Sequence, residues 1–244
     1  MKKRHLVLGL MLIAITGIAS AQNTPTAEST QQRAKSPWSV GITGGFCTNT
    51  PSIQVPDYAS YITYKSGDGA TVGITGRYQI AKWLAARASM VWIQKNYKMD
   101  RMGYNGSNII NTNYTNNYIS LPLAVQVQVG YPFRLFAFAG GYVGYWLSGH
   151  RSGNTFTMNY LLYGDVESTN FDTDWEFNDE RDNRFDAGLM FGGGASFSIK
   201  NKIEVSAEAA YYYGLTDTQK QYMLYMRPHY NSTLAIQASI LYNL

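Results

Sequence analysis

The sequence has only one cysteine, Cys47, among its 244 residues. A single thiol can form neither an internal disulfide nor a metal site built from several thiolates. The sequence also contains no P-loop, no dinucleotide-binding fingerprint and no His-Glu-x-x-His motif. We therefore expect no cofactor and no resident metal ion.

Long apolar runs are missing after the first 21 residues. Residues 1–21 begin with three basic residues, continue with the apolar run Leu6–Ile18 and end in Ala19–Ala21. This order is typical of a secretory signal peptide, and we expect cleavage after Ala21. The apolar run is shorter than the roughly 20 residues that a transmembrane helix needs. An uncleaved N-terminal anchor is the less favoured alternative.

The chain also lacks a strong excess of charge. It has 20 Lys and Arg against 16 Asp and Glu, a net charge of +4. Three of the basic residues lie in the expected leader, which leaves a net charge of +1 on the mature chain. This balance gives no reason to expect binding to nucleic acid. Residues 22–36 have no hydrophobic period and are expected to be flexible, ahead of one domain over residues 37–244.

What the sequence does contain is alternation. Ile203–Leu215 reads IEVSAEAAYYYGL, with an apolar or aromatic residue at every second position and Glu204 and Glu208 between them. This period indicates a strand, because successive side chains of a strand point to opposite faces. Pro122 is expected to cause a local defect in its strand. The predicted strands are Trp38–Thr48, Ala70–Ile80, Leu84–Met99, Tyr118–Val129, Arg134–Ser148, Arg184–Ile199, Ile203–Leu215 and Thr233–Leu244.

The connections between these strands alternate in length. Residues 49–69, 100–117, 149–183 and 216–232 form long connections, and residues 81–83, 130–133 and 200–202 form short ones. Outer-membrane barrels combine short periplasmic turns with long extracellular loops and an even strand number. We therefore predict an all-β fold, an eight-stranded antiparallel up-and-down transmembrane β-barrel in a bacterial outer membrane. Both termini would be periplasmic, and the surface would contact outer-membrane lipid and lipopolysaccharide.

Aromatic residues gather near both ends of the predicted strands, where membrane barrels carry interfacial girdles. The periplasmic girdle would comprise Trp38, Tyr78, Trp83, Tyr131, Phe133 and Tyr242. The outer girdle would comprise Tyr97, Tyr118, Tyr145, Trp146 and Tyr211–Tyr213.

Four of the strands resemble those of the PorT-like outer-membrane β-barrel family. The matching motifs are Leu121–Leu123, Phe138–Tyr145, Phe185–Gly194 and Glu208–Thr216, and the resemblance covers about residues 38–244. It implies an eight-stranded barrel, and one type of member is tied to the type IX secretion pathway. The chain departs from the usual terminal aromatic residue of outer-membrane barrels, since it ends in Tyr242-Asn243-Leu244.

Alternation assigns polar side chains to the inner face of this barrel. An eight-stranded interior is only wide enough for its own side chains, and charges buried there must be paired. We therefore expect Arg77 and Arg87 to reach Glu204 or Glu208 across the lumen, with Arg184 also facing inward and Gly41, Gly73 and Gly192 leaving room for long side chains. The full predicted network is Arg77, Arg87, Gln126, Gln128, Asp186, Glu204, Glu208 and Gln237.

Three functional hypotheses follow. The favoured one is a small non-enzymatic outer-membrane protein with a filled lumen, which acts through its extracellular loops or as a partner in an envelope or secretion complex. The second is a narrow channel or transport component with a gated ion path. The third is an enzyme at the outer rim, where His150 and His229 lie with Ser148, Ser152 and loop carboxylates as candidate partners.

The connection 149–183 is rich in carboxylates at close spacing, an arrangement that can bind calcium. It lacks the ligand order and glycine of an EF-hand loop, so a solvated acidic loop is the favoured interpretation. The carboxylates are Asp165, Glu167, Asp172, Asp174, Glu176, Asp179, Glu180 and Asp182.

Overall fold

The structure is a computed structural model that describes residues 36–53, 62–102, 109–158, 166–199, 202–220 and 228–244. The predicted signal peptide and all but one residue of the predicted flexible segment lie outside the described residues. Within the described ranges, no helix has the length and apolar character needed to cross a membrane.

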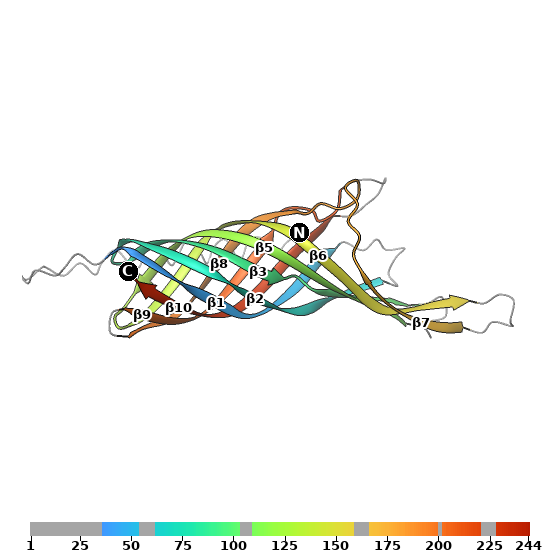
Figure 1. The fold of residues 1–244 in the computed structure, drawn as a ribbon, viewed down its shortest axis with the longest axis horizontal. Helices are drawn as coiled ribbons and strands as arrows, with labels where there is room; N and C mark the ends of the chain where they lie inside the picture. The colour runs from blue at the N-terminus through green and yellow to red at the C-terminus, as the bar shows by residue number, and fades with distance from the viewer. Residues whose placement is uncertain (1–35, 54–61, 103–108, 159–165, 200–201, 221–227) are drawn as a thin grey trace, which may run out of the picture. The chain divides into compact units, whose positions relative to one another are not determined.

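The described chain is built from antiparallel strands (Figure 1). They are β1 (Trp38–Ile53), β2 (Ile62–Ala81), β3 (Leu84–Gln94), β4 (Tyr97–Met102), β5 (Ile109–Val129), β6 (Phe133–Met158), β7 (Val166–Asp174), β8 (Phe185–Ile199), β9 (Ile203–Gly214) and β10 (His229–Asn243).

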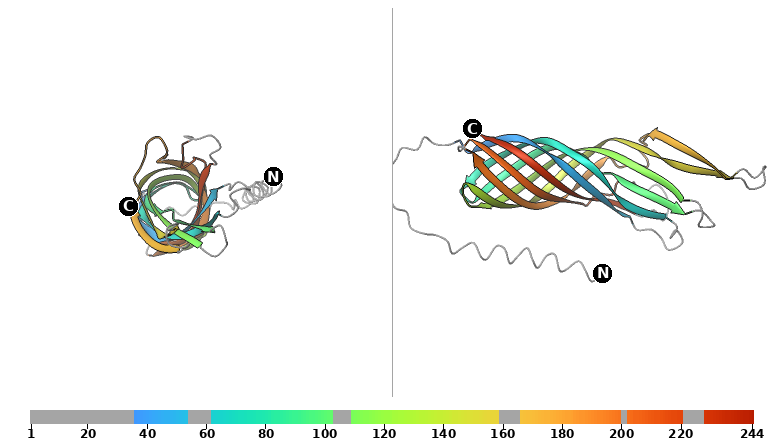
Figure 2. Two further views of the ribbon diagram at one scale, coloured as in Figure 1. Left: turned by 90° about the vertical axis from the view of Figure 1, so that its right-hand side faces the viewer. Right: turned by 90° about the horizontal axis from the view of Figure 1, so that it is seen from below.

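Eight of these strands close into a ring. The pairing runs β1–β2–β3–β5–β6–β8–β9–β10 and returns to β1. The remaining two extend the wall: β4 follows β3 and lies between β2 and β5, and β7 pairs with β6. A view along the barrel shows the closed ring (Figure 2). The predicted eight-stranded antiparallel up-and-down barrel is confirmed.

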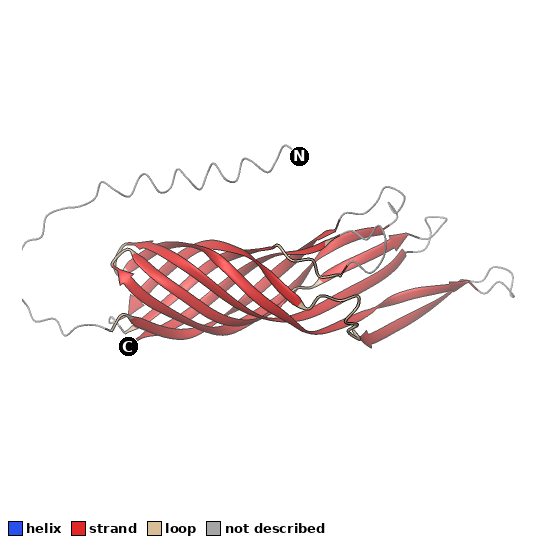
Figure 3. Ribbon diagram, turned by 90° about the horizontal axis from the view of Figure 1, so that it is seen from above, coloured by secondary structure: helices blue, strands red, loops and turns tan. Residues whose placement is uncertain are grey.

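The two ends of the barrel differ. We call the end with the turns at residues 82–83 and 130–132 the turn end, and the opposite end the loop end. At the loop end the long connections predicted for residues 49–69, 100–117, 149–183 and 216–232 are partly wrong, because strands continue into all four. β6 runs to Met158 and pairs there with β7, a hairpin that stands out beyond the rest of the barrel (Figure 3). These extensions carry polar residues on both faces, so they have no hydrophobic period to detect.

The two faces of each strand separate apolar from polar side chains. In β9 the odd-numbered side chains are mostly exposed and the even-numbered ones buried, as the alternation predicts. The exposed side chains of the wall are large and apolar, as expected for a surface in contact with lipid. β6 is apolar on both faces, so its orientation could not be predicted. Its buried face consists of Phe136, Phe138, Tyr142 and Trp146.

The aromatic residues of the turn end lie as predicted for a girdle. All six are exposed on the outer surface: Trp38, Tyr78, Trp83, Tyr131, Phe133 and Tyr242.

The girdle predicted at the other end is partly wrong. Tyr145 and Tyr213 are exposed, but Tyr118, Trp146 and Tyr212 are buried inside the barrel. In each strand these residues alternate with outward-facing ones. Their position near a strand end therefore did not indicate whether their side chains point into the barrel or toward lipid.

Two local expectations are changed by the packing. Gly192 makes room for an aromatic ring rather than a charged side chain, since a Cβ at this position would lie 2.6 Å from Phe138 Cζ. At Pro122, pairing with β6 continues opposite Tyr142, and pairing with β3 lapses only between Ala88–Leu123 and Val91–Ser120, without a change of register. The defect at Pro122, which has no backbone N–H to donate, is therefore confined to the side of β5 that faces β3.

Candidate functional site: the side-chain network that fills the barrel

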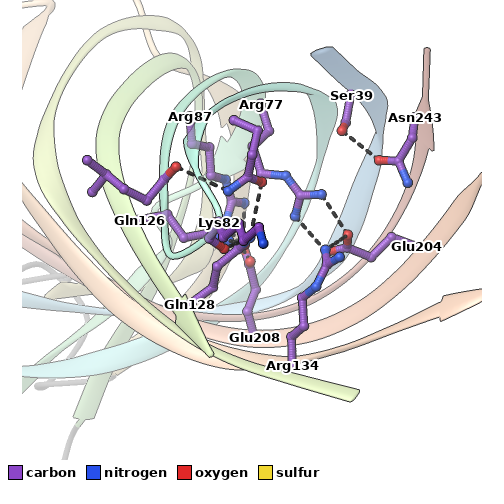
Figure 4. A network of polar contacts seen from close by, with 12 residues as sticks. Ser39, Arg77, Lys82, Arg87, Gln126, Gln128, Arg134, Glu204, Glu208 and Asn243 are labelled. Carbon is purple, nitrogen blue, oxygen red and sulfur yellow. Dashed lines mark hydrogen bonds and ion pairs between the residues drawn. The ribbon is translucent and has the colours of Figure 1, made fainter. Parts of the chain in front are cut away.

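The first ion cluster lies toward the turn end (Figure 4). Arg77 on β2 donates to both carboxylate oxygens of Glu204 on β9, with N–O distances of 2.6 Å. Arg134, at the start of β6, donates to the same carboxylate at 2.9 Å. Glu204 is 1% exposed, so its charge is removed from water and is balanced by two guanidinium groups.

A second arginine–glutamate pair lies beside this cluster. Arg87 on β3 donates through both terminal nitrogens to Glu208, again at 2.6 Å. The guanidinium of Arg87 also lies 5.0 Å from the ring centroid of Phe138. Both pairs use the planar fork of arginine, which matches the two oxygens of a carboxylate. We call Arg77, Arg87, Arg134, Glu204 and Glu208 the Arg–Glu layer.

Amide side chains lie inside the barrel next to the Arg–Glu layer. Gln126 donates to Gln128, and Gln128 donates to Gln79, each at 3.1 Å. Gln237 lies elsewhere in the lumen and donates to Thr71 Oγ1 at 3.1 Å. The amides are thus joined to fixed partners rather than to the ion pairs.

A separate ion pair lies toward the loop end. Lys95 Nζ is 2.5 Å from Asp186 Oδ2, and neither side chain is more than 1% exposed. Asp186 also accepts from the hydroxyls of Tyr142 at 3.3 Å and Thr216 at 3.2 Å. The ammonium lies 4.6 Å from the ring centroid of Tyr142 and 5.3 Å from that of Tyr118. We call Lys95, Asp186, Tyr118, Tyr142 and Tyr212 the Lys–Asp layer; Tyr212 is the third ring around the ammonium, at 5.9 Å.

Two cations of these layers, Lys95 and Arg134, are missing from the network predicted from the sequence. Lys95 falls on the polar face of its strand, which was the available signal. Arg134 begins a strand whose faces could not be told apart. Arg184 precedes β8 and joins neither ion-paired layer: it donates to Trp146 O at 2.9 Å and lies 4.0 Å from the ring centroid of Phe177 and 4.6 Å from that of Tyr145.

Aromatic rings cover the Lys–Asp layer. Trp146 stacks on Tyr118 with centroids 5.8 Å apart. Trp175 and Phe177, which follow β7, lie 6.0 and 4.9 Å from Trp146. The segment after β7 therefore folds over the loop end of the lumen.

Little free space remains inside. The cavity beside Glu204 and the cavity beside Tyr212 each have a volume of about 10 Å³. A water molecule needs roughly 10–15 Å³ measured in this way. Each cavity therefore holds about one water at most, and two ion-paired layers lie across the lumen.

The two histidines proposed for a rim enzyme have other partners. Both ring nitrogens of His150 contact carboxylates, Asp172 at 2.7 Å and Asp174 at 2.9 Å. The hydrogen bond to Asp174 raises the pKa of His150 above its ordinary value. His229 packs its ring 6.1 Å from Tyr64, and burial lowers its pKa. Among the described contacts, neither imidazole is hydrogen-bonded to a serine.

The carboxylates of the predicted acidic loop are scattered. Asp165 lies outside the described residues. Asp182 accepts from Trp175 Nε1 at 3.2 Å and from the backbone N–H of Asn178 at 2.9 Å. Burial alone would raise the pKa of Asp182, but these bonds and Arg181 lower it. In the part of the chain that the structure describes, no three His, Cys, Asp or Glu residues are grouped to hold a metal ion.

The lipid-facing wall and the ion-paired interior define a class: a small transmembrane β-barrel whose lumen is filled by its own side chains. A family model described as "Outer membrane protein beta-barrel domain" matches residues 20–220, and the chain belongs to this family. It is therefore an outer-membrane β-barrel protein of the Gram-negative envelope.

Solved structures of small barrels are similar in outline. OprG from Pseudomonas aeruginosa is 12% identical, with 86% of this chain and 98% of that chain covered and a TM-score of 0.46. Neisserial surface protein A is 12% identical, with 87% and 100% covered and a TM-score of 0.44. Ail of Yersinia pestis is 14% identical, with 83% and 97% covered and a TM-score of 0.37. No curated protein has a matching sequence.

Proposed function

We propose that this barrel is a non-enzymatic outer-membrane protein that binds a partner outside the cell through its loop end. In this orientation the turn end, where the described chain begins and ends, faces the periplasm. The observation that carries the proposal is the β6–β7 hairpin. A strand needs about 9–11 residues to cross the membrane, whereas β6 has 26 residues and β8 has 15. The excess length of β6 holds β7 outside the bilayer.

The mode of binding is suggested by the edge of β7. In the described residues β7 pairs with β6 alone, so its other edge is available to an extended segment of a partner. Asp172 and Asp174 on β7 have side chains that are 75% and 93% exposed. This acidic edge favours a basic or polar partner strand over an apolar one.

Photo-cross-linking in intact cells tests this proposal. A photoreactive residue is placed at Thr173 on β7 and, as the control, at Thr63, which is exposed on β2 at the same end. A specific cross-linked product is expected from Thr173 and not from Thr63. Equal products from both positions, or none from Thr173, would contradict the proposal.

A shortened hairpin provides the second arm. Gly153 and Phe171 are paired across β6 and β7, so an Asn-Gly turn can replace residues 154–170. The product from Thr173 should be lost, while heat-modifiable gel migration remains as evidence of a folded barrel.

A partner within the envelope is the second candidate. It is supported by the PorT-like motifs at Leu121–Leu123 and Glu208–Thr216, and type IX secretion components are the partners they suggest. Co-purification in mild detergent separates the two candidates. If secretion components co-purify equally with the shortened hairpin, the partner binds elsewhere on the barrel.

The channel hypothesis is weakened by the two ion-paired layers. We expect no large, stable conductance in planar bilayers. Such a conductance would overturn the closed-lumen part of the proposal and would leave the role of the β6–β7 hairpin untouched.

A further inference from the structure

The outer surface has a hollow that plays no part in closing the lumen. It lies across the outward faces of β2, β3 and β5, reaches β6, and has a volume of about 410 Å³. Its floor is made of small residues, Gly76, Ala86 and Ala88. Arg87 also lines the hollow, but its guanidinium lies inside the barrel, where it is bound to Glu208. The volume falls in the range of about 300–1,000 Å³ that is usual for small-molecule sites.

Large side chains form the walls of this hollow. On one side the rings of Trp38 and Tyr78 lie 4.8 Å apart, and on the other side stand Leu123 and Val125. All four belong to the exposed surface of the barrel, with Leu123 64% exposed. This surface faces the bilayer, so hydrocarbon rather than water must fill the hollow; if it stayed empty, its lining would lose dispersion contacts.

A cation lies just below the hollow. Lys82, in the turn between β2 and β3, is exposed and is four residues from Ala86, about 13 Å along an extended chain. Within the described ranges, no carboxylate forms an ion pair with Lys82. Glu204 is the one acidic side chain in residues 77–86, 126–136 and 202–206, and it is buried and paired. Lys82 therefore places a positive charge on the rim beside the hollow. The C-terminal carboxylate also lies at this end, since the Leu244 N–H donates to Trp38 O at 3.0 Å, but it forms no ion pair with Lys82.

We propose that the hollow binds one anionic phospholipid of the inner leaflet, with an acyl chain between the Trp38–Tyr78 pair and Leu123 and the phosphate at Lys82. Tryptophan and tyrosine favour the interface between lipid headgroups and acyl chains, and lysine attracts anionic headgroups. A second copy of the barrel is a poorer occupant, because a two-fold contact over this surface would bring two Lys82 side chains together. The proposal uses the orientation given above but not the role of the β6–β7 hairpin.

The test uses the full chain in nanodiscs made of phosphatidylethanolamine and phosphatidylglycerol. Native mass spectrometry after release into detergent counts the lipids that stay bound. Wild-type protein should retain one phosphatidylglycerol. Lys82→Gln should lower the preference for phosphatidylglycerol about fivefold, the share expected of one lysine near an anionic surface. Lys202→Gln, in the β8–β9 turn away from the hollow, is the matched control and should keep the preference.

Filling the hollow provides the second arm. Ala86→Leu with Ala88→Leu should abolish retention of lipid, whereas Ala209→Leu, on the exposed face of β9, should not. Both changes point away from the lumen, so the ion pairs and folding are preserved. Retention that is unchanged in the Ala86/Ala88 variant, or absent from wild type, would overturn the proposal. A dimer that Ala86→Leu disrupts would assign the hollow to a second copy instead.

Discussion

The two layers of the lumen bury opposite charges in different ways. In the Arg–Glu layer, three guanidinium groups surround two carboxylates, and each carboxylate accepts at least two hydrogen bonds from arginine. In the Lys–Asp layer, one ammonium meets one carboxylate, and the other contacts are tyrosine rings and hydroxyls. Buried charges in the Arg–Glu layer are therefore compensated by further charges, and those in the Lys–Asp layer by polarisable neutral groups.

The contrast follows from the shapes of the cations. The forked guanidinium of arginine binds a carboxylate through two parallel hydrogen bonds, so several arginine–carboxylate pairs can fit in a small space. The lysine ammonium is a compact charge that attracts aromatic faces from several directions. Losing one partner should therefore cost more in the Arg–Glu layer, where charge faces charge, than in the Lys–Asp layer.

The largest effect is expected from Glu204→Gln. This change leaves the guanidinium groups of Arg77, which is buried, and Arg134, which is partly buried, without their counter-charge. We expect a loss of about 3–5 kcal/mol in the free energy of unfolding, the usual cost of breaking a buried ion pair. Urea unfolding in lipid vesicles measures it. A loss below that of Lys95→Met would contradict the order of the two layers.

Lys95→Met should have a smaller effect. Asp186 keeps the hydroxyl donors of Tyr142 and Thr216. We expect a loss of about 1–3 kcal/mol, the range for an imperfectly satisfied buried group. The same unfolding measurement applies, and a loss equal to that of Glu204→Gln would contradict the difference between the two layers.

Replacing only the forked guanidinium of an arginine should lower the free energy of unfolding by less still. Arg87→Lys keeps the charge opposite Glu208 but replaces two directed bonds with one ammonium. We expect a loss of about 1.5 kcal/mol, roughly one charge-assisted hydrogen bond. The control is Arg87→Met with Glu208→Leu, which removes both charges and should cost less than either single change to an apolar residue.

The smallest effect lies outside the membrane, at His150. Its hydrogen bond to Asp174 raises its pKa above the usual value near 6.5. The bond thus contributes fully below the unfolded pKa and is lost as pH rises through the higher folded pKa. NMR titration of the imidazole should show this raised pKa, and Asp174→Asn should lower it. An unchanged titration midpoint would remove Asp174 as the cause.

The sequence predicts the barrel because lipid imposes a strict rule on its surface. Every outward side chain of β9 and β10 must be apolar or small, so alternation is clear and the inner positions of Glu204 and Glu208 follow from it. Inside, no such rule holds. β6 lines the lumen with Phe136, Phe138 and Tyr142, and an inner face made of rings cannot be told from an outer one.

The remaining differences have similar causes. The partners of Asp186 and the second arginine on Glu204 depend on contacts across the barrel, between strands far apart in the chain. The extensions of β2, β5 and β6 carry polar residues on the buried face as well, such as Thr112 and Asn116 of β5, so no apolar face marks them in the sequence. The position of Arg184 depends on where β8 begins, and strand boundaries are set by pairing rather than by composition.

The contact between Arg77 and Glu204 has one more consequence. These residues lie on β2 and β9, the strands that flank the junction where β1 meets β10. A slip of two residues at that junction would keep every side chain on its proper face and so would satisfy the alternation. It would also move the strands by about 7 Å, which no 2.6 Å ion pair could follow. The bridge across the junction therefore selects the one register in which the first and last strands of the barrel join.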